Sequence, residues 1–489
     1  MILKDLISFY IEEKNLNNLF LEVIDRPVLG IETNSQKIKN GYIFIAIKGD
    51  KIDGNNFIND AIDNGAICIF SDSAKKEYFI DSIPIFPVSE PREFVGKICS
   101  RFFGYPQKNI KIIGITGTNG KTSTISILKN IFEASGKKTL QVGTLGLVPK
   151  ILDDYNGLTT PDTVEAYKIL NKAVENAYEY VLFEVSSHAL VQNRLSNIKF
   201  RIASFTNISR DHLDFHKTFE DYFLAKSKIF DSIDLNGKKL INIDCMYGQR
   251  LNEIEEESLT LSTSGRNADF ACIDYKVSME GIFANFRFFD KEFSISSSLI
   301  GKIYIENILM ASAIAFLSGC SFFEIIKGVK EITSINGRLD RVENIPNDIF
   351  LDYGHSPAAF EATLSSIKEI SEKKIKVLFG AGGNRDKTKR SFMAKSVEKY
   401  ADFIYLAPDN PREEKIQDIN QQVALGFKKN NHKIFLDRGD ALKEALLDLN
   451  TEDVLIIFGK GNETYQEVLG EKQYYSDKEI ILEFYENRN

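Results

Sequence analysis

The sequence predicts an α/β protein of three domains: a small N-terminal α/β domain, a central domain built on a P-loop-type, mostly parallel sheet, and a C-terminal Rossmann-like domain. Its 489 residues are too many for a single hydrophobic core. Apolar runs of strand length alternate with helical stretches, as in doubly wound sheets. A glycine-rich loop at 114–122 joins one such run to a helix. Together these observations favour sheets that bind ligands at their strand ends.

The predicted first domain, residues 1–89, contains two candidate strands and a helix. Residues 42–47 and 66–70 are apolar runs of strand length. The polar turn at 48–55 and a helix-like stretch at 57–64 lie between them. This order predicts a small α/β module.

The predicted second domain, residues 90–336, opens with a helix and carries the glycine-rich loop. Strand-like runs follow at 180–183 and 203–206. From 269 to 300 the pattern changes to closely spaced alternating strands. That stretch predicts an antiparallel addition to a mostly parallel sheet.

The predicted third domain, residues 337–489, alternates strongly between strands and helices. Its candidate strands are 349–351, 375–379, 403–406, 433–436 and 454–458. Polar clusters follow these strands directly, at 352–355, 380–390, 409–413 and 459–463. Because ligands of such sheets bind beyond the carboxyl ends of the strands, the clusters predict a binding site there.

The glycine-rich loop predicts a nucleotide site. Its glycines stand at 114, 117 and 120 and are followed by Lys121 and Thr122, a tightened variant of the general P-loop spacing. A strand that feeds such a loop into a helix presents backbone N–H groups to phosphate oxygens. Lys121 would reach the terminal phosphates and Thr122 would place its hydroxyl on Mg²⁺. We therefore expect ATP or a close relative as ligand.

Acidic and histidine side chains suggest further chemistry. Four of the five histidines lie in polar clusters; they are His188, His212, His216 and His355. Taken singly, each could equally be a satisfied surface or core histidine. Glu184 ends an apolar strand, where a carboxylate can meet the Mg²⁺ of a nucleotide.

Composition limits the partners and the compartment. The net charge of −8 argues against nucleic acid, because no basic stripe supplies affinity for phosphate backbones. No apolar run approaches the ~20 residues of a membrane span. The five cysteines are scattered and predict reduced core residues. We expect a cytoplasmic monomer that binds neither nucleic acid nor membranes.

A series of motifs gives the chain a resemblance to a known family. They are Gly-Thr-Asn-Gly-Lys-Thr at 117–122, Thr-Thr-Pro at 159–161, Glu-Val-Ser-Ser-His-Ala-Leu at 184–190, Thr-Asn-Ile-Ser-Arg-Asp-His-Leu-Asp at 206–214, Asn-Gly-Arg at 336–338, Asp-Tyr-Gly-His-Ser-Pro at 352–357, Gly-Asn-Arg-Asp-Lys at 383–387, Asp-Asn-Pro-Arg at 409–412 and Gly-Lys-Gly-Asn-Glu at 459–463. In order and spacing they resemble the Mur ligase family over nearly the full length. The resemblance implies an ATP-dependent ligase of peptidoglycan precursor synthesis that adds meso-diaminopimelate to UDP-N-acetylmuramoyl-L-alanyl-D-glutamate through an acyl phosphate.

The resemblance also assigns roles to residues. The UDP substrate would meet Thr33, Ser35, the loop at 50–52, Thr159, Thr160, Ser186, Gln192 and Arg194. ATP would meet Gly117, Thr118, Asn119, Gly120, Lys121, Thr122, Asn307, Arg338, Asp352 and His355. Mg²⁺ would be served by Thr122, Glu184, His212 and Lys226, the last as a carbamate derived from CO₂. Lys121, Glu184, His212 and Lys226 form the implied catalytic set.

Lys226 and the departures from the family pattern bear on these assignments. From the residues alone, Lys226 would be an ordinary lysine on a helix surface. Departures from the family pattern are Asn34 and Gln36 beside Ser35, Leu158 before Thr159, Tyr304 in place of a first asparagine and Asn462 in place of a histidine.

The implied acceptor differs from lysine by a second carboxylate at its far end. An arginine fork suits that group because it binds a carboxylate through two hydrogen bonds. The expected diaminopimelate residues are Arg385, Asp409, Asn410, Arg412, Gly459 and Glu463. Asp409 and Glu463 would take the distal ammonium, and Arg412 would take the carboxylate unless it is merely a solvated loop residue.

Other functions compete with this one. A sibling ligase that uses lysine would not explain the presence of Arg412. A folate polyglutamylating enzyme would not explain the presence of the first domain. A P-loop switch protein would hydrolyse nucleotide without an acceptor amine, and its GTPase form would need an Asn-Lys-x-Asp motif that is absent from the sequence. A pure binding module does not require so many polar clusters at strand ends.

Overall fold

The computed structural model describes residues 1–14, 25–49, 52–153, 155 and 157–487. Positions 50 and 51 of the loop expected to meet UDP lie outside the described residues. The chain divides into two compact units. The first unit comprises Met1–Gly114, Lys137–Ala203 and Lys228–Lys238, and the second comprises Ile115–Gly136, Ser204–Ser227 and Lys239–Asn489. Among the described helices, none combines the length and the apolar character that a membrane span requires.

The N-terminal part of the first unit is a five-stranded sheet in the order β1-β2-β3-β5-β4. Its strands are β1 (Gly30–Glu32), β2 (Tyr42–Ala46), β3 (Ala66–Ser71), β4 (Tyr78–Ile80) and β5 (Ile83–Pro87). All neighbours pair in parallel except β4 and β5. The short helices of this part are α1 (Leu3–Leu6), α2 (Ser8–Lys14), η1 (Ser35–Lys37), η2 (Gly54–Phe57) and α4 (Ile58–Asp63). The predicted strands at 42–47 and 66–70 and the helix at 57–64 are confirmed.

The rest of the first unit continues the α/β pattern. β7 (Thr139–Gly143) pairs in parallel with β9 (Tyr180–Glu184) and antiparallel with β8 (Gly146–Val148). The helices are α5 (Pro91–Phe102), η3 (Pro106–Lys108), α7 (Thr163–Glu175), α8 (Ser187–Val191) and η4 (Lys228–Ser232). α5 packs on α7. The chain passes between the units within β6 (Lys111–Thr116) and β10 (Phe200–Phe205).

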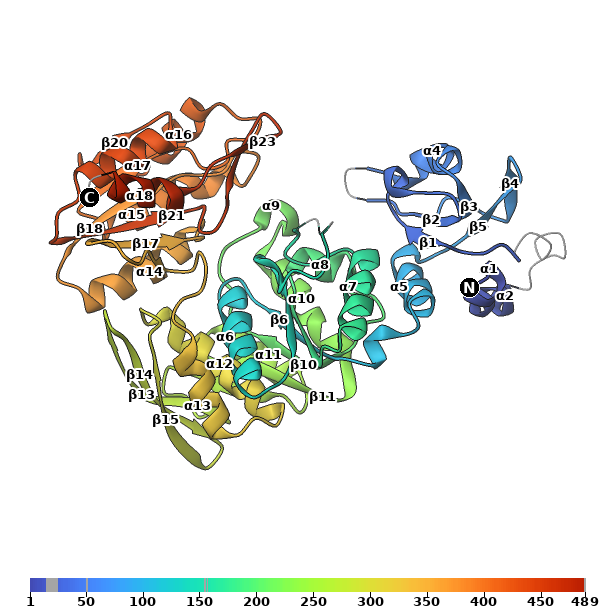
Figure 1. Cartoon of the computed structure of the whole chain (residues 1–489), viewed down its shortest axis with the longest axis horizontal. Helices are drawn as coiled ribbons and strands as arrows, with labels where there is room; N and C mark the ends of the chain where they lie inside the picture. Colours follow the sequence, from blue (N-terminus) through green and yellow to red (C-terminus); the bar gives the residue numbers. More distant parts are fainter. Residues whose placement is uncertain (15–24, 50–51, 154, 156, 488–489) are drawn as a thin grey trace. The chain divides into compact units, whose positions relative to one another are not determined.

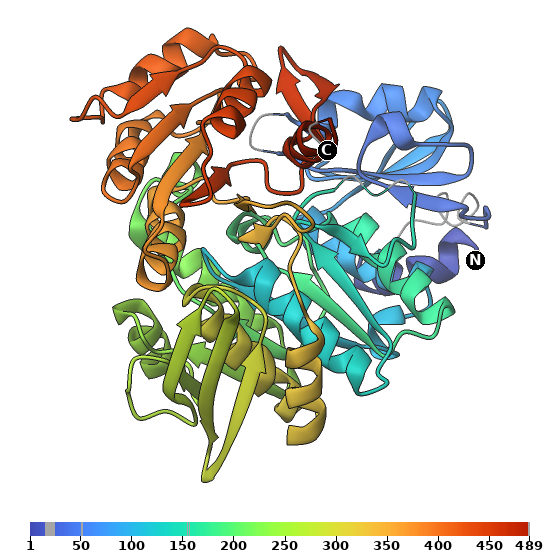
Figure 2. The ribbon, with the colours of Figure 1, turned by 60° about the vertical axis from the view of Figure 1, so that its left-hand side comes forward.

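The second unit begins with the helix that follows the glycine-rich loop. This helix, α6 (Lys121–Ala134), packs against α12 (Ile303–Leu317) and α13 (Phe322–Glu331), which lie beside it in Figures 1 and 2. α12 is buried along most of its length, in keeping with a sequence that is apolar on nearly every face. The smaller helices are α9 (Leu213–His216), α10 (Phe219–Ser227) and α11 (Met246–Ile254).

The strands of this part confirm the predicted change of pattern. The end of β11 (Ile233–Asn242) pairs in parallel with β12 (Leu259–Ser262), and β12 pairs in parallel with β13 (Phe270–Ser278). β14 (Gly281–Phe288) and β15 (Lys291–Ser297) then join antiparallel. The antiparallel strands expected at 269–300 are therefore present.

The C-terminal part is a six-stranded sheet in the order β16-β17-β21-β18-β19-β20. Its strands are β16 (Asp340–Arg341), β17 (Asp348–Asp352), β18 (Lys374–Phe379), β19 (Phe403–Leu406), β20 (His432–Ile434) and β21 (Asp453–Phe458). Every pair is parallel except β16 with β17. β17 and β21 are buried at every position, as expected of strands covered on both faces. The predicted Rossmann-like domain is confirmed.

Helices cover this sheet on both faces (Figure 1). They are α14 (Pro357–Ile370), η5 (Lys387–Lys389), α15 (Arg390–Glu398), α16 (Ile416–Ala424), α17 (Arg438–Leu447) and α18 (Asp477–Glu486). α14, α15 and α16 pack in series, while α17 packs with α18. A hairpin of β22 (Tyr465–Val468) and β23 (Glu471–Tyr474) follows the last parallel strand.

The cysteines only partly match their prediction. All five are free, and four are buried. Cys245 is not a core residue but the N-cap of α11, where its sulfur accepts a hydrogen bond from the Gly248 amide at 3.4 Å. A thiol can replace the usual serine or aspartate at a helix N-cap. The scattered positions of the cysteines in the sequence do not distinguish such a cap from a core residue.

Candidate active site

The glycine-rich loop has the strand–loop–helix geometry that the sequence predicts. β6 ends at Thr116, and Gly120 caps the N-terminus of α6 with a φ of +87°. A Cβ atom on Gly120 would lie 2.4 Å from Oδ1 of Asn307, and one on Gly117 would lie 1.9 Å from Oγ1 of Thr206. A Cβ atom at either position would force its neighbour to shift, and both glycines have a positive φ. The backbone of the loop therefore requires glycine at these positions, as the phosphate-loop prediction does.

Two lysine amines converge on this loop. Nζ of Lys121 donates to the carbonyl oxygens of Gly117 at 2.8 Å and Thr118 at 2.9 Å. Nζ of Lys226 donates to the same Gly117 oxygen at 2.7 Å. Lys226 is 2% exposed, so the expectation of a surface lysine from the residues alone is wrong. α10 buries the face that carries it, which its own sequence does not reveal because its apolar and polar residues are not segregated.

Burial holds the pKa of Lys226 well below its usual value, and the charge of Lys121 lowers it further. Asp211 acts in the opposite direction without reversing the shift. The lowered pKa favours the neutral form of the Lys226 amine beside the phosphate loop. A neutral amine is a nucleophile, whereas an ammonium is not.

The residues expected to meet the nucleoside also lie at the loop. Oδ1 of Asn307, at the start of α12, accepts a hydrogen bond from Oγ1 of Thr124 at 3.3 Å. Nη2 of Arg338 donates to Oγ1 of Thr122 at 3.1 Å, although 216 positions separate these two residues. The guanidinium of Arg338 stacks 4.6 Å from the ring centre of Tyr353. The fold thus brings Thr122, Asn307 and Arg338 to one phosphate loop.

Asp352 is the last residue of β17, and His355 follows three positions later. The Asp352 carboxylate accepts hydrogen bonds from the amides of Leu339 at 2.8 Å and Gly354 at 2.6 Å. Burial raises the pKa of Asp352. Burial also lowers the pKa of His355, and the charge of Lys389 lowers it further, so the imidazole is held neutral.

His212 belongs to an acidic and basic cluster that sequence reasoning missed. Its backbone is left-handed, with φ at +53°, and its amide donates to Oδ1 of Asp211 at 3.0 Å. Nζ of Lys389 lies 3.8 Å from that same oxygen. Burial opposes ionisation of Asp211, but His212, His355 and Lys389 hold its pKa at about 2. Asp211 stands inside a quoted motif, yet nothing in its spacing distinguishes it from a loop residue.

Sequence reasoning also missed Asn207 and Glu306, which hold the loop in place through hydrogen bonds. Oδ1 of Asn207 accepts from the amide of Asn119 at 3.0 Å, and its Nδ2 donates to Oε1 of Glu306 at 3.0 Å. Burial raises the pKa of Glu306 to about 7. The sequence signal was the position of Glu306 directly before Asn307.

In the first unit, Glu184 and the expected sugar–peptide residues form a connected set. The Glu184 carboxylate is fully buried and accepts from the amide of Thr144 at 2.9 Å and from its hydroxyl at 3.1 Å. Oγ1 of Thr144 lies 3.3 Å from that of Thr159. Oγ1 of Thr160 donates to the carbonyl of Glu184 at 2.7 Å and accepts from the amide of Ser186 at 2.9 Å.

Arg194 closes this set. Its Nη1 donates to the carbonyl of Thr160 at 3.0 Å, and its Nε and Nη2 donate to Oε1 of Gln192 at 3.0 and 2.8 Å. Ser35 lies in the N-terminal part of the same unit, where Asn34 caps its short helix by accepting from the amide of Gln36 at 3.0 Å. Asn34, one of the departures from the family pattern, thus has a local role. Thr33 directly precedes this cap.

The expected acceptor residues gather at the carboxyl ends of β19 and β21. Asp409 and Asn410 are buried, and Nδ2 of Asn410 donates to Oε2 of Glu463 at 3.0 Å. Gly459 has a φ of +104°, and a Cβ atom there would lie 2.9 Å from Oδ2 of Asp409. The pattern of polar clusters after strands predicted this meeting of separate loops.

Arg412 is not a freely solvated loop residue. Its Nε donates to Oε2 of Glu467 at 3.1 Å, and its Nη1 donates to the carbonyl of Gly383 at 2.8 Å. Its amide also donates to the carbonyl of Glu467 at 3.0 Å, which ties the loop to β22. Arg385, by contrast, is exposed. Glu467 was missed because it stands alone in a hairpin strand with no motif around it.

Comparison with known proteins identifies the family. The Mur ligase family catalytic domain matches residues 27–103, the Mur ligase middle domain matches 115–315, and the Mur ligase glutamate ligase domain matches 337–461. A protein of Aquifex aeolicus named UDP-N-acetylmuramoyl-L-alanyl-D-glutamate--2,6-diaminopimelate ligase is 37% identical, with 95% of each chain covered. The chain belongs to the Mur ligase family. It is therefore an enzyme, an ATP-dependent ligase.

Other relatives of this Mur ligase agree. Proteins with the same printed name from Rickettsia montanensis and Fusobacterium nucleatum are each 35% identical, covering 96% and 94% of this chain and 97% and 94% of their own. A solved structure of a UDP-N-acetylmuramoyl-L-alanyl-D-glutamate--2,6-diaminopimelate ligase superposes with a TM-score of 0.69 at 25% identity, covering 100% of this chain and 99% of its own. A MurF ligase of Thermotoga maritima in complex with ADP shares the fold, with a TM-score of 0.64 at 19% identity and coverage of 94% and 97%.

The metal expected in a Mur ligase site would not depend on acidic residues alone. Within the described ranges, no group of three or more His, Cys, Asp or Glu side chains is placed to hold a metal ion. The expected ligands include the Thr122 hydroxyl and a modified Lys226, and Mg²⁺ completes its shell with phosphate oxygens and waters. The buried amine of Lys226 lies at the loop, where a carbamate on it would fit that ligand set.

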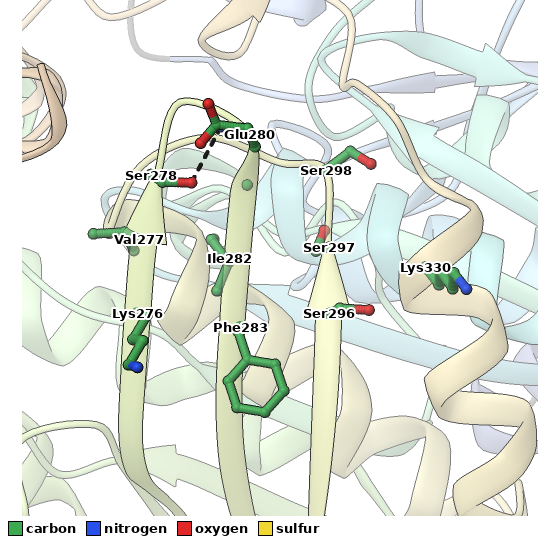
Figure 3. A pocket seen from close by; sticks show the side chains of 11 residues that line it. Lys276, Val277, Ser278, Glu280, Ile282, Phe283, Ser296, Ser297, Ser298 and Lys330 are labelled. Atoms are coloured by element: carbon green, nitrogen blue, oxygen red, sulfur yellow. Dashed lines mark hydrogen bonds between the residues drawn. The ribbon is translucent and has the colours of Figure 1, made fainter.

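A cavity of about 340 Å³ lies elsewhere in this Mur ligase, at one end of the antiparallel strands. Figure 3 shows Lys276 and Phe283 on neighbouring strands and Lys330 on α13. None of the residues expected to bind substrates lines it. This cavity is therefore not at the expected site of the chemistry.

Proposed function

We propose that this Mur ligase joins meso-diaminopimelate to UDP-N-acetylmuramoyl-L-alanyl-D-glutamate, with ATP converted to ADP and phosphate. The single observation that carries the choice of acceptor is the placement of Arg412. Arg412 belongs to the same loop as Asp409 and Asn410. Its guanidinium is held by hydrogen bonds to Glu467 and Gly383, which lie in other segments. A cationic fork close to carboxylates suits a molecule whose distal carbon bears both a carboxylate and an ammonium. The printed names of the relatives support the same substrates.

ATP activates the D-glutamyl carboxylate, which is otherwise a poor acyl donor. A carboxylate oxygen attacks the γ-phosphorus, the bond to the β,γ-bridging oxygen breaks, and ADP leaves. Lys121 is the side chain placed to meet the charge of the transferring phosphoryl group, because its amine already rests on the loop carbonyls. Arg338 and Asn307 would hold the nucleoside.

The acyl phosphate then reacts with the amine of the acceptor. The amine nitrogen attacks the carbonyl carbon, a tetrahedral intermediate forms, and phosphate leaves as the amide closes. The attacking amine must lose a proton, and His355 is the candidate acceptor because burial and Lys389 keep its imidazole neutral. Water has to be excluded while the acyl phosphate exists, since it hydrolyses.

Mg²⁺ and the carbamate belong to this proposal. Thr122, Glu184, His212 and carbamylated Lys226 would hold the metal, which neutralises phosphate charge. Lys226 suits carbamylation because burial lowers the pKa of its amine, which already lies at the loop. Carbamylation would turn an amine, whose ammonium form is poorly suited to a neighbouring metal, into an anion able to bind it.

The remaining substrate contacts and the domain roles are proposed in the same way. Thr33, Ser35, Thr159, Thr160, Ser186, Gln192 and Arg194 would bind the UDP substrate. Residues 1–89 would form its UDP-binding domain, 90–336 the ATP-binding domain and 337–489 the domain that binds the amino acid. We propose a monomer working in the cytoplasm on small-molecule substrates.

One experiment tests the reaction and the acceptor together. Phosphate release by the purified enzyme is measured with Mg-ATP and UDP-N-acetylmuramoyl-L-alanyl-D-glutamate, with either meso-diaminopimelate or L-lysine added. We expect release that depends on diaminopimelate, and a product heavier by one diaminopimelate residue. Turnover with lysine alone would overturn the acceptor. Turnover without the amine and the UDP substrate would overturn the ligase reaction in favour of a P-loop switch.

A further inference from the structure

Lys460 is a buried lysine to which the proposed reaction gives no task. It lies two positions after the end of β21, and it is 0% exposed. Its ammonium donates to Oδ1 of Asn410 at 2.8 Å, to the carbonyl of Tyr465 at 2.8 Å and to Oε2 of Glu463 at 3.3 Å. An ammonium has three protons, and these bonds use all of them. Lys460 therefore has no hydrogen left to offer a substrate.

The partners of Lys460 are the residues proposed to bind the acceptor. Oδ1 of Asn410 receives two donors, Lys460 and the amide of Glu467 at 2.9 Å. That arrangement fixes the orientation of the Asn410 amide, so its Nδ2 must point to Glu463, to which it donates at 3.0 Å. Lys460 thus sets the direction of both side chains.

Asp409 adds a second observation that points to a ligand. Its Oδ1 lies 3.6 Å from Nζ of Lys460, beyond hydrogen-bond distance. Asp409 is 7% exposed, and no described residue donates a hydrogen bond to that oxygen. A buried carboxylate oxygen with an adjacent cation but no donor is an acceptor waiting for an N–H group from outside the chain.

We propose that Lys460 is the positioning residue of the acceptor pocket: its buried ammonium holds Asn410 and Glu463 in the orientation that receives the distal ammonium and carboxylate of the amino acid, and leaves Asp409 Oδ1 without a hydrogen-bond donor of its own. The inference rests on the proposed function, since it assumes that the amino acid binds at these residues. Lys460 acts through its neighbours and does not touch the substrate.

Lys376 provides a matched control within the same sheet. It is also a buried lysine, 7% exposed, and its ammonium lies 2.8 Å from Oδ2 of Asp448 and 3.0 Å from Oδ2 of Asp453. Lys376 is a residue of β18 and contacts Asp453, the first residue of β21, whereas Lys460 lies two positions after the last residue of β21. Both substitutions remove a buried cation from two carboxylates, but only one does so at the proposed pocket.

The test compares Lys460→Met and Lys376→Met by steady-state kinetics and thermal unfolding. For Lys460→Met we expect the KM for meso-diaminopimelate to rise about ten- to a hundredfold, the loss that follows removal of a hydrogen bond to a charged group. The KM values for ATP and for the UDP substrate should stay unchanged, because the substitution weakens the binding of diaminopimelate alone. Lys376→Met should lower Tm and leave all three KM values unchanged.

Each outcome decides the proposal. An unchanged KM for diaminopimelate with a lowered Tm would make Lys460 merely structural, and a parallel rise in all three KM values would do the same. If Lys460→Met does not fold, Lys460→Arg keeps the charge but displaces it, and the same selective rise in acceptor KM is required of it. If the wild-type enzyme itself forms no product with any diamino acid, the proposed function fails, and Lys460 is not the reason.

Discussion

Nζ of Lys226 lies 2.7 Å from the carbonyl oxygen of Gly117, so a lysine of α10 is bonded to the phosphate loop 109 positions before it. The same oxygen also accepts from Lys121 at 2.8 Å. Two amines on one carbonyl would repel each other if both were charged. Burial lowers the pKa of Lys226, and the repulsion from Lys121 lowers it further. Of the two amines on this carbonyl, Lys226 is therefore the one whose neutral form is favoured.

The first prediction concerns that amine. Lys226→Ala should lower kcat by about a hundredfold or more, the usual cost of removing a group that stabilises transition-state charge. Short carboxylates such as acetate should restore part of the activity, because they can take the place of a carbamate. Phosphate release with and without added acetate measures both effects.

Lys228→Ala is the matched control, since Lys228 is an exposed lysine two positions along the chain. It should leave kcat unchanged. Full activity of Lys226→Ala would remove the carbamate from the proposal, and a loss that acetate cannot relieve would assign Lys226 to holding the loop.

The second prediction isolates the fit of the loop around the nucleotide. Gly120 and Gly136 flank the two ends of α6 and both have a positive φ, +87° and +77°. A Cβ atom on Gly120 would lie 2.4 Å from Asn307 Oδ1, whereas one on Gly136 would meet nothing within 4 Å. Substitution by alanine should therefore cost both variants about 1 kcal/mol of backbone strain, but only Gly120→Ala should displace Asn307.

We expect Gly120→Ala to raise the KM for ATP at least about tenfold, the equivalent of 1.4 kcal/mol, and Gly136→Ala to leave it unchanged. Equilibrium unfolding in urea verifies that the two substitutions destabilise the fold similarly. Equal KM values in the two variants would mean that Asn307 does not take part in nucleotide binding.

The sequence predicted the strands and sheets more completely than the contacts between distant residues. The strands at 375–379 and 454–458 identified the C-terminal sheet, because burial on both faces leaves a hydrophobic run, interrupted in these two strands only by Lys376. β1, with three residues, was too short to give a periodic signal. Parallel pairing also depends on contacts between distant segments that no local pattern records.

The site shows the same division. The loop at 117–122 was predictable, since strand, glycines and helix leave a local signature. Lys226 and Lys460 were not, because each owes its burial to elements that fold over it from elsewhere in the chain. Arg412 lies between: its motif indicated a role, but its partner Glu467 belongs to a separate hairpin.

The third prediction tests the discrimination between acceptors. Arg412→Ala should raise the KM for meso-diaminopimelate by about ten- to a hundredfold, the loss of a charge-assisted hydrogen bond, and should change turnover with L-lysine much less. Glu467→Gln provides the comparison, because it keeps a hydrogen-bond acceptor for Arg412 while removing the opposing charge. An equal effect of Arg412→Ala on both amino acids would mean that Arg412 does not bind the distal carboxylate.

The fourth prediction concerns pH. Burial raises the pKa of Glu306 from its ordinary 4.5 to about 7, and Asp244 adds to the rise, while hydrogen bonds from Asn207 and Asn242 oppose it. Because the folded state holds this proton more tightly, the resulting stability is complete below about pH 4.5 and is lost as the pH rises through 7. Glu306→Gln, which stays neutral, should therefore become more stable relative to wild type between pH 5 and 8, by about 1–3 kcal/mol.

Urea unfolding across this range measures the difference. Glu292→Gln, on an exposed strand position, should show none. A parallel pH dependence in the Glu306 variant and wild type would show that Glu306 is ionised throughout.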